Sequence, residues 1–363
     1  MSAPSTSRTS GPAGDAPRPT RRSPARVAGL VLLAVAGALL AAAAIWPVWF
    51  GLSTVPGVLH ALSFRSFIAV GGVAAGLLAL LVLRPWRRTA TGARRWWQTI
   101  VVTSLLAVGV GNAAVVAGRG WATGPVAGEP DLVVVGFNTQ IGAERDATSV
   151  DELVALVTDT GADVVSLPET PREVADQVAA RLAEQDRGFQ VFSTRESRRP
   201  TSETSLLVAE DVGPYEQTDA PDTVLGTVRA RPVGHDGPVL VAVHAGSPVR
   251  ATGWDRWAAS VATAVAQAAP TVDGTGTVVV GDFNATVDHA PMRDLPDGVV
   301  DAASAAGRGA EGTWPSSRPV LLASPIDHVL VDGNTFLVLG THTVRVSDSD
   351  HRAVVADLAL RAP

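Results

Sequence analysis

Polar residues able to bind a metal or a phosphate directly follow one apolar run of this chain. The run Thr277–Val280 leads into Gly281, Asp282, Phe283 and Asn284. Gly, Asp and Asn are the usual residues of turns, so the motif predicts at least a tight turn. A carboxylate and a carboxamide two residues apart at a strand end also suit a metal or phosphate site. Only the rest of the chain distinguishes these two interpretations.

Several other apolar runs are bounded by residues of the same kinds. They are Asn138 after Leu132–Val135, Glu169 after Val164–Leu167, His244 after Val239–Val243, Asp327 and His328 before Val329–Val331, and Asp350 and His351 before Ala353–Val355. Strand ends in a packed sheet lie along one rim, where the ligands of α/β proteins bind. A single strand-terminal Asn, Asp or His is usually a turn or structural residue, but their repetition favours convergence on one site.

The residue types in this set indicate a reaction class. Carboxylates such as Glu169 and Asp350 are hard ligands that suit Mg²⁺ or Mn²⁺. Asp282 can orient or deprotonate a water molecule, and histidines can bind phosphoryl oxygens or transfer protons near neutral pH. The set therefore predicts metal-assisted hydrolysis of a phosphate ester. The chain has no cysteine, no Gly-x-Ser-x-Gly and no His-Glu-x-x-His, which excludes thiolate chemistry and argues against a serine nucleophile or that zinc motif.

Strand-like and helix-like segments alternate after Asp131, which predicts one large α/β domain over residues 131–363. The segment Ser149–Gly161 has apolar residues at helical spacing. Ser149 and Glu152 fit a capping box there, and Gly161 fits a helix end. Further helices are expected over residues 172–185 and 255–269. Strands are expected over residues 132–138, 162–170, 202–210, 223–233, 238–248, 277–285, 326–333, 336–347 and 352–360.

The chain resembles the endonuclease/exonuclease/phosphatase superfamily, the DNase I-like proteins, in an ordered set of short motifs. They are Asn138, Ser-Leu-Pro-Glu at 166–169, Val-His at 243–244, Gly-Asp-Phe-Asn at 281–284, Thr-Trp-Pro at 313–315, Ile-Asp-His-Val-Leu-Val at 326–331 and Ser-Asp-His-Arg-Ala-Val at 349–354. Each motif alone is common, but this order and spacing are specific. The resemblance covers residues 131–360 and implies a four-layer α/β sandwich, in which two packed sheets carry helices on their outer faces.

The resemblance implies a divalent metal site. Glu169 would be the main ligand of Mg²⁺ or Mn²⁺, with Asn138 beside it and Asp350 as a further acidic ligand. Gln140 stands where some nucleases have an acidic ligand, which argues against a second metal. Pro168 stands where the family often has Gln, which implies a different fit to the substrate.

The resemblance also implies which residues act on the phosphate. Asp282 would orient or activate the attacking water, and Asn284 would bind the phosphate. His351 would contact the scissile phosphate with Asp327 as its carboxylate partner. His244 would be a second phosphate-binding or acid/base histidine.

Other polar residues near these motifs have simpler interpretations. We expect His328 to be structural, and Asp288 and His289, just beyond the Gly-Asp-Phe-Asn turn, to lie in a solvated loop. The basic run with Arg195, Arg198 and Arg199 is also expected to be a solvated loop, with a local phosphate-facing patch as the alternative.

The first third of the chain predicts three transmembrane helices within residues 27–117. The apolar runs Val27–Phe50, Ser63–Leu83 and Gln98–Ala117 are each about 20 residues long, enough to cross a hydrocarbon core about 30 Å thick. Arg65 lies near one end of the second run, from where its side chain could snorkel. A cleavable signal peptide is the alternative for the first run, but its apolar stretch is longer than usual and two more runs follow.

Arginines in the short flanking segments predict the orientation of these helices. Residues 1–26 carry five Arg and residues 84–97 carry five, whereas residues 51–61 carry none. Both basic segments are therefore expected in the cytoplasm, which puts the catalytic domain of this multi-pass cell-membrane protein outside it. Residues 1–26 are expected to form a disordered basic tail, and residues 118–130 a linker.

The distribution of charge bears on the substrate. Residues 129–363 hold 17 Arg against 34 Asp and Glu, a formal charge of −17, and the chain has no Lys. Because affinity for nucleic acid comes largely from Lys and Arg, a lipid head group or a small phosphate ester is favoured over nucleic acid. The leading hypothesis is a membrane-anchored, metal-dependent phosphodiesterase or phosphomonoesterase. The alternatives are an extracellular nuclease of the same chemistry and a catalytically silent envelope binding domain.

Overall fold

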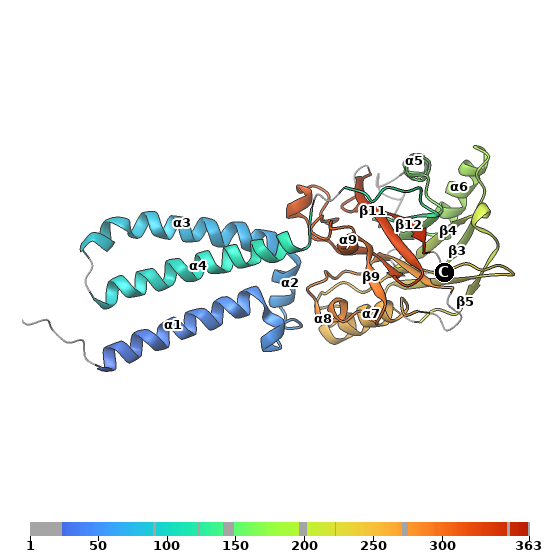
Figure 1. The fold of residues 1–363 in the computed structure, drawn as a ribbon. Helices are drawn as coiled ribbons and strands as arrows, with labels where there is room; N and C mark the ends of the chain where they lie inside the picture. Colours follow the sequence, from blue (N-terminus) through green and yellow to red (C-terminus); the bar gives the residue numbers. More distant parts are fainter. Residues whose placement is uncertain are drawn as a thin grey trace, which may run out of the picture.

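Three long apolar helices extend from one side of an α/β domain (Figure 1). The structure is a computed structural model, and it describes residues 24–89, 92–121, 124–140, 149–195, 202–221, 223–270, 275–346 and 349–361. The long helices are α1 (Pro24–Ile45), α3 (Arg65–Thr89) and α4 (Ala93–Gly118). Most of the predicted tail, residues 1–23, and Arg198 and Arg199 lie outside the described residues.

The three long helices have the length and composition of membrane spans. Their apolar stretches Val27–Ile45, Arg65–Arg84 and Arg94–Gly118 have mean hydropathies of 2.5, 2.5 and 2.2. α3 and α4 pack closely where Gly72 faces Gly109, since a Cβ at Gly72 would lie 2.7 Å from the Gly109 backbone. Small residues at such contacts let membrane helices approach each other. These features support the predicted spans.

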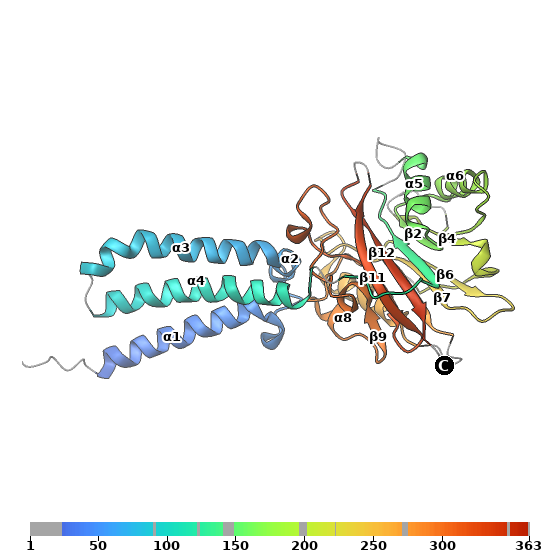
Figure 2. The same ribbon diagram turned by 45° about the horizontal axis from the view of Figure 1, so that its top comes forward.

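The first apolar run does not stay helical to Phe50. α1 ends at Ile45, and Pro47–Phe50 form a separate short 3-10 helix, η1. Pro47 has no N–H and restricts the residue before it, which explains the break. A short helix, α2 (Val58–Ser63), then leads to α3 and lies between the long helices and the domain (Figure 2). The chain between α1 and α3 is therefore folded structure at the domain end of the helices.

The strands of the described residues form two six-stranded sheets of mixed direction. The order in the first sheet is β11 (Phe336–Arg345), β12 (Arg352–Leu360), β1 (Leu132–Gly136), β2 (Val164–Pro168), β4 (Thr204–Ala209) and β3 (Phe189–Ser193). The order in the second is β5 (Tyr215–Thr218), β6 (Gly226–Pro232), β7 (Val239–His244), β8 (Thr277–Asp282), β10 (Asp327–Asp332) and β9 (Val299–Asp301). Strands β3, β5 and β9 were not predicted from the sequence.

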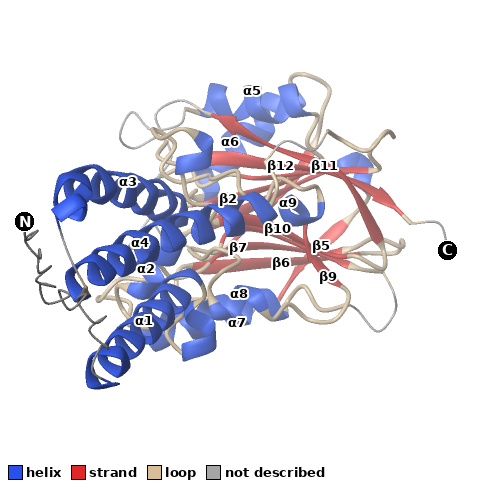
Figure 3. Cartoon of the chain, turned by 60° about the vertical axis from the view of Figure 1, so that its left-hand side comes forward, coloured by secondary structure: helices blue, strands red, loops and turns tan. Residues whose placement is uncertain are grey.

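The two sheets pack face to face, with helices on both outer faces (Figure 3). Side chains such as Val134, Leu206 and Leu240 fill the layer between the sheets. The outer helices are α5 (Val150–Thr160) and α6 (Arg172–Ala183) on the first sheet, and α7 (Trp254–Ala266) and the short α8 (Ala290–Arg293) on the second. The short helix α9 (Ala302–Ala305) follows β9. This arrangement confirms the predicted four-layer sandwich.

Local signals in the sequence determine several element ends. Ser149 accepts a hydrogen bond from the backbone N–H of Glu152, whose carboxylate accepts one from the backbone of Ser149, so the predicted capping box is formed. Gly161 closes α5 in the left-handed conformation. The segment after α4, predicted as a linker, packs on the domain, because the carbonyl of Gly120 accepts from Ala310 N–H and Val126 N–H donates to Leu339.

Candidate active site

Three neighbouring strands of the second sheet end at one place with polar residues. β7 runs parallel to β8 with His244 opposite Asp282, and β10 runs antiparallel to β8 with Asp327 opposite Asp282. The carboxyl ends of β7 and β8 therefore meet the start of β10. This register sets one imidazole and two carboxylates side by side, all of them buried.

The Gly-Asp-Phe-Asn segment is both a turn and part of the site. A Cβ at Gly281 would collide with the carbonyl oxygen of Val243, so only glycine lets β8 lie this close to β7. Asn284 has a positive φ of 50°, and its N–H donates to Oδ1 of Asp282 at 2.7 Å. Its side-chain amide donates to the carbonyl of Ala245 at 3.0 Å. The turn thus holds Asp282 and Asn284 in fixed positions at the rim.

The first sheet contributes a second group of side chains that meets Asp282. Nδ2 of Asn138 lies 3.1 Å from Oδ2 of Asp282 and 3.4 Å from Oε1 of Glu169. Nε2 of His244 lies 3.6 Å from the same Asp282 oxygen and 3.9 Å from the same Glu169 oxygen. Glu169 has a positive φ of 60°, a strained conformation of the kind that clusters at functional sites. Residues of both sheets therefore converge on the carboxylates of Glu169 and Asp282.

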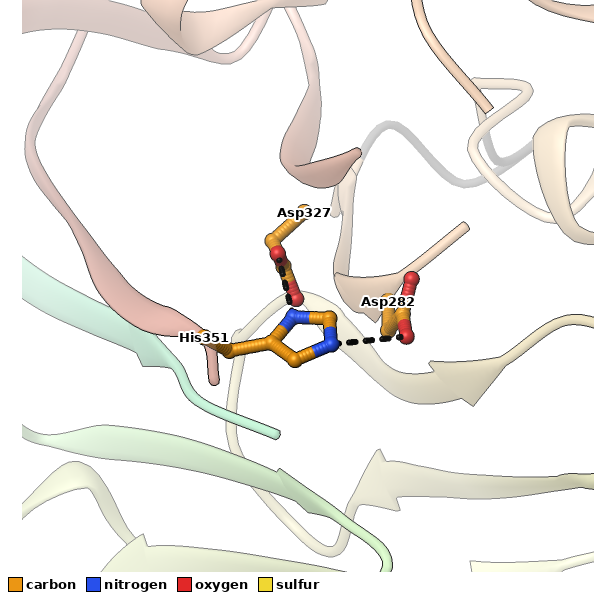
Figure 4. A group of neighbouring side chains, drawn as sticks. All are labelled: Asp282, Asp327 and His351. Atoms are coloured by element: carbon orange, nitrogen blue, oxygen red, sulfur yellow. Dashed lines mark hydrogen bonds and ion pairs between the residues drawn. The ribbon is translucent and has the colours of Figure 1, made fainter. Parts of the chain in front are cut away.

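His351 lies between Asp282 and Asp327 (Figure 4). Its Nδ1 lies 2.9 Å from Oδ2 of Asp327, and its Nε2 lies 3.9 Å from Oδ2 of Asp282. The same Nε2 lies 3.8 Å from Oδ1 of Asp350. The contacts around Asp282 and His351 join all eight predicted site residues: Asn138, Glu169, His244, Asp282, Asn284, Asp327, Asp350 and His351.

Burial and nearby charges shift the pKa values of Asp282 and His351. Burial, together with the charge of Asp327, raises the pKa of Asp282 to about 7. Burial alone would lower the pKa of His351, but the attraction of Asp327, Asp282 and Asp350 outweighs it and raises this pKa to about 10. At neutral pH the site therefore holds an imidazolium among carboxylates.

Three residues outside the eight predicted site residues support the site. Nε1 of Trp314 donates to Oδ2 of Asp350 at 2.9 Å, and Oε1 of Gln140 accepts from the Asp350 N–H at 3.0 Å. Oγ of Ser349 donates to the carbonyl of Asn138 at 2.9 Å. Trp314 belongs to the Thr-Trp-Pro motif, so this motif was the signal for it. Gln140 lies two residues after Asn138 and Ser349 opens the Ser-Asp-His-Arg-Ala-Val motif, but their contacts with the site are visible only once these segments meet.

His328 lies beside the site but is engaged elsewhere. Its Nδ1 lies 2.7 Å from Oδ2 of Asp301, and its Nε2 lies 2.9 Å from the carbonyl oxygen of Ala285. Both ring nitrogens are thus used within the fold, as expected for a structural histidine.

The prediction of a solvated loop for Asp288 and His289 was wrong. His289 is buried, and Asp288 forms ion pairs with Arg65 and Arg119, with only 3% of the Arg65 side chain and 7% of the Asp288 side chain exposed. Arg65 therefore does not snorkel to solvent either. The cause is the docking of the long helices on this part of the domain, which replaces water around the loop. A pattern of residues along the chain does not reveal such a contact.

The donor set suits a hard divalent cation. Glu169, Asp282, Asp327 and Asp350 bring carboxylates together, and Oδ1 of Asp327 is buried without a hydrogen-bond partner. Asp282, Asp327 and His351 offer ligand atoms within 4.8 Å of one another. The last two of these are hydrogen-bonded to each other, and the carboxylates of Glu169 and Asp350 are more exposed than those of Asp282 and Asp327.

Comparison with known proteins agrees with this geometry. A sequence profile of the endonuclease/exonuclease/phosphatase family matches residues 135–351. This match covers more than half of the chain, so the chain belongs to that family. The family consists of divalent-metal-dependent nucleases and phosphatases, and the chain is accordingly a hydrolase of phosphate ester bonds.

Several solved structures are similar to this chain. One is an endonuclease/exonuclease/phosphatase from Bacteroides vulgatus, with 20% identity and a TM-score of 0.47, covering 63% of this chain and 99% of that one. Another is a mannosyl-6-phosphatase from Bacteroides thetaiotaomicron, with 15% identity and a TM-score of 0.47, covering 63% and 100%. A third is humanized D. rerio TDP2, with 14% identity and a TM-score of 0.49, covering 62% and 98%. No curated protein matched the chain.

Proposed function

We propose that the chain is a membrane-anchored, divalent-metal-dependent phosphoesterase whose site faces outside the cytoplasm. The observation that carries this proposal is the continuous set of contacts that joins the eight residues of the site. Carboxylates, amides and histidines that meet at one rim are what metal-assisted hydrolysis of a phosphate ester needs.

The metal would be held by the accessible carboxylates. Glu169 and Asp350 would bind Mg²⁺ or Mn²⁺, and Asn138 would orient the Glu169 carboxylate through the 3.4 Å contact. Bound there, the cation would supply positive charge to the phosphoryl oxygens. Asn138 also contacts Asp282, so it links the metal-binding side to the water-activating side.

The remaining residues would act on water and phosphate. Asp282, with a pKa of about 7, is suited to orient the attacking water and take its proton near neutral pH. Asn284 and His244 would bind phosphate oxygens. His351, kept protonated by Asp327, would donate a hydrogen bond to the scissile phosphate.

The anchoring and orientation rest on two features of the first third of the chain. Three helices among the described residues are long and apolar enough to cross a membrane. In the sequence, the Arg-rich segment 1–26 leads into α1 and the Arg-rich segment 84–97 connects α3 to α4, and this arginine bias favours the cytoplasm for both. The domain would then lie outside. Its acidic composition favours lipid head groups or small phosphate esters over nucleic acid.

The test is hydrolysis of para-nitrophenyl phosphate and bis(para-nitrophenyl) phosphate by the full chain in detergent, with Mg²⁺, Mn²⁺ or chelator. We expect divalent-dependent turnover that Glu169→Gln and Asp282→Asn each reduce by about 10²-fold or more. The matched controls Glu173→Gln and Asp159→Asn change exposed acids on α6 and α5 and should leave turnover unchanged. Unaltered turnover in either site variant contradicts the proposal.

A catalytically silent binding domain makes a different prediction. Such a domain would show neither turnover nor Mg²⁺ or Mn²⁺ binding at this rim. Calorimetric titration of the full chain with each metal, beside the Glu169→Gln variant, separates the two, because the phosphoesterase should bind metal and lose affinity with this substitution.

A further inference from the structure

A cavity of about 260 Å³ opens directly beside the catalytic residues. Asn284 and His351 line it from the rim of the sheets, and Trp314 and Val249 line it from loops of the domain. The opposite side does not belong to the α/β domain. It consists of His60, Ser63 and Phe64, which we name the α2 wall, from the segment that joins α1 to α3.

The α2 wall is fixed in the fold of the domain. Leu59 is fully buried in the same apolar cluster as Trp257 under the second sheet. Its carbonyl oxygen lies 2.9 Å from Nε2 of His289, whose Nδ1 accepts from a backbone N–H, so the imidazole donates to Leu59. The ring of His60 packs edge-on against Trp254 at 5.6 Å. The α2 wall is therefore a fixed part of the cavity.

The α2 wall directly precedes a candidate membrane span. Phe64 is followed directly by Arg65, where the apolar stretch Arg65–Arg84 of α3 begins. Figures 1 and 2 show α2 between the long helices and the domain. The ring of Phe64 lies 5.8 Å from that of Trp314, the residue that donates to Asp350. The catalytic cavity thus lies at the level where the helices would leave the bilayer.

The surroundings of the cavity suit a bilayer surface. Val249 on its rim is 45% exposed, and Phe67 in the first turn of α3 and Leu321 on the nearby domain surface are each 38% exposed. The guanidinium of Arg318 lies 5.7 Å from the ring of Phe67. Apolar side chains beside an arginine are typical of segments that enter the head-group region of a membrane.

We propose that the substrate is a lipid-linked phosphate ester, taken directly from the bilayer past the α2 wall. This inference rests on the proposed phosphoesterase function. The hydrocarbon part stays among the lipids, while the phosphate reaches Asn284 and His351. Water attacks phosphorus while Asp282 takes its proton, and the bond between phosphorus and the leaving oxygen breaks. Asp282 then returns this proton through solvent to the leaving oxygen, which becomes an alcohol.

The experiment compares matched substrates with and without acyl chains. The full chain is placed in phosphatidylcholine nanodiscs that contain phosphatidic acid or phosphatidylglycerol, and separately offered glycerophosphate or glycerophosphoglycerol in solution. We expect at least one lipid to be hydrolysed with about tenfold or higher kcat/KM than its deacylated counterpart. Equal rates, or faster turnover of the deacylated esters, would overturn the inference.

Two variants test whether the α2 wall selects the lipid. Phe64→Ala shortens the wall, and Val249→Asp places a charge on the exposed rim, where loss of folding is not expected. Each should lower the ratio of lipid to soluble turnover by about fivefold or more. Trp49→Ala removes an exposed aromatic of η1 outside the cavity and should leave the ratio unchanged. A ratio that neither wall variant moves contradicts the inference.

Turnover of the nitrophenyl esters distinguishes a failure of the lipid inference from a failure of the phosphoesterase function. If these esters are hydrolysed with Mg²⁺ or Mn²⁺ but no lipid is, the phosphoesterase function stands and the lipid inference fails. If no ester of any kind is hydrolysed, the phosphoesterase function itself fails, and the lipid inference fails with it.

Discussion

Arg65 and Asp288 form a buried ion pair, with 2.5 Å between Nε and Oδ2, that joins the start of α3 to the segment after β8. Arg119, just after α4, contacts the same carboxylate oxygen. Arg65 also donates to the carbonyl of Ile45 at the end of α1 and to Oδ1 of Asn112 in α4. One carboxylate of the catalytic domain therefore connects to all three long helices.

Removing the charge of the Asp288 carboxylate should destabilise the contact between the long helices and the catalytic domain, which we call the junction. Asp288→Asn leaves two buried guanidinium groups without their anion, and breaking a buried pair in this way costs about 3–5 kcal/mol. We expect a lower unfolding temperature of the full chain in detergent and faster proteolysis between α1 and α3. The matched control is Asp297→Asn, an exposed acid nearby. Equal stability of both variants would show that the ion pairs do not hold the junction.

Binding of a divalent cation should release a proton from Asp282. Because its pKa lies near 7 without metal, this carboxyl is partly protonated at neutral pH, and a nearby positive charge lowers the pKa and favours the ionised form. Calorimetric titration with Mg²⁺ in buffers of different ionisation enthalpy measures the protons released. Asp282→Asn should abolish most of this release. Asp163→Asn, at a carboxyl whose pKa burial also raises, should not.

The Asp327 carboxylate should control the alkaline side of the pH profile. Asp327 and its neighbours raise the pKa of His351 to about 10, so the imidazolium persists through neutral pH. Asp327→Asn removes negative charge, lowers that pKa, and should move the loss of kcat/KM to lower pH, with a fall of about 10²–10⁴-fold at pH 8. Asp332→Asn, at the far end of the same strand, is the control. If kcat/KM of Asp327→Asn falls at the same alkaline pH as that of the unsubstituted chain, Asp327 does not control the protonation of His351.

Gly281 should not tolerate a side chain. In Gly281→Ala the new Cβ would meet the carbonyl oxygen of Val243, so β8 must move away from β7 and take Asp282 with it. We expect a loss of about 3 kcal/mol or more in the free energy of unfolding and a large loss of activity. Chemical denaturation measures the first and ester hydrolysis the second. Gly124→Ala, where a Cβ meets open space, should change neither.

Much of the catalytic domain could be predicted because its signals are local. Alternating apolar segments predicted most strands, and the residues Ser149, Glu152 and Gly161 predicted both ends of α5. The eight candidate site residues could be predicted because each lies at or near a strand end within a short motif, and strand ends of a packed sheet share a rim. The short strands β3, β5 and β9 lack a strong period, which is why they were missed.

Long-range contacts decided what the sequence left open. Whether Asp288 meets water depends on Arg65 and Arg119, which lie far away along the chain and reach it only after the helices dock. In the same way, the α2 wall becomes part of the catalytic cavity only when Leu59 packs beneath the second sheet. The sequence by itself determined most of the strands and the three long apolar helices, and it predicted the chemistry of the site. Only the tertiary structure decided that the two parts share a cavity, because burial and charge pairing depend on neighbours in space.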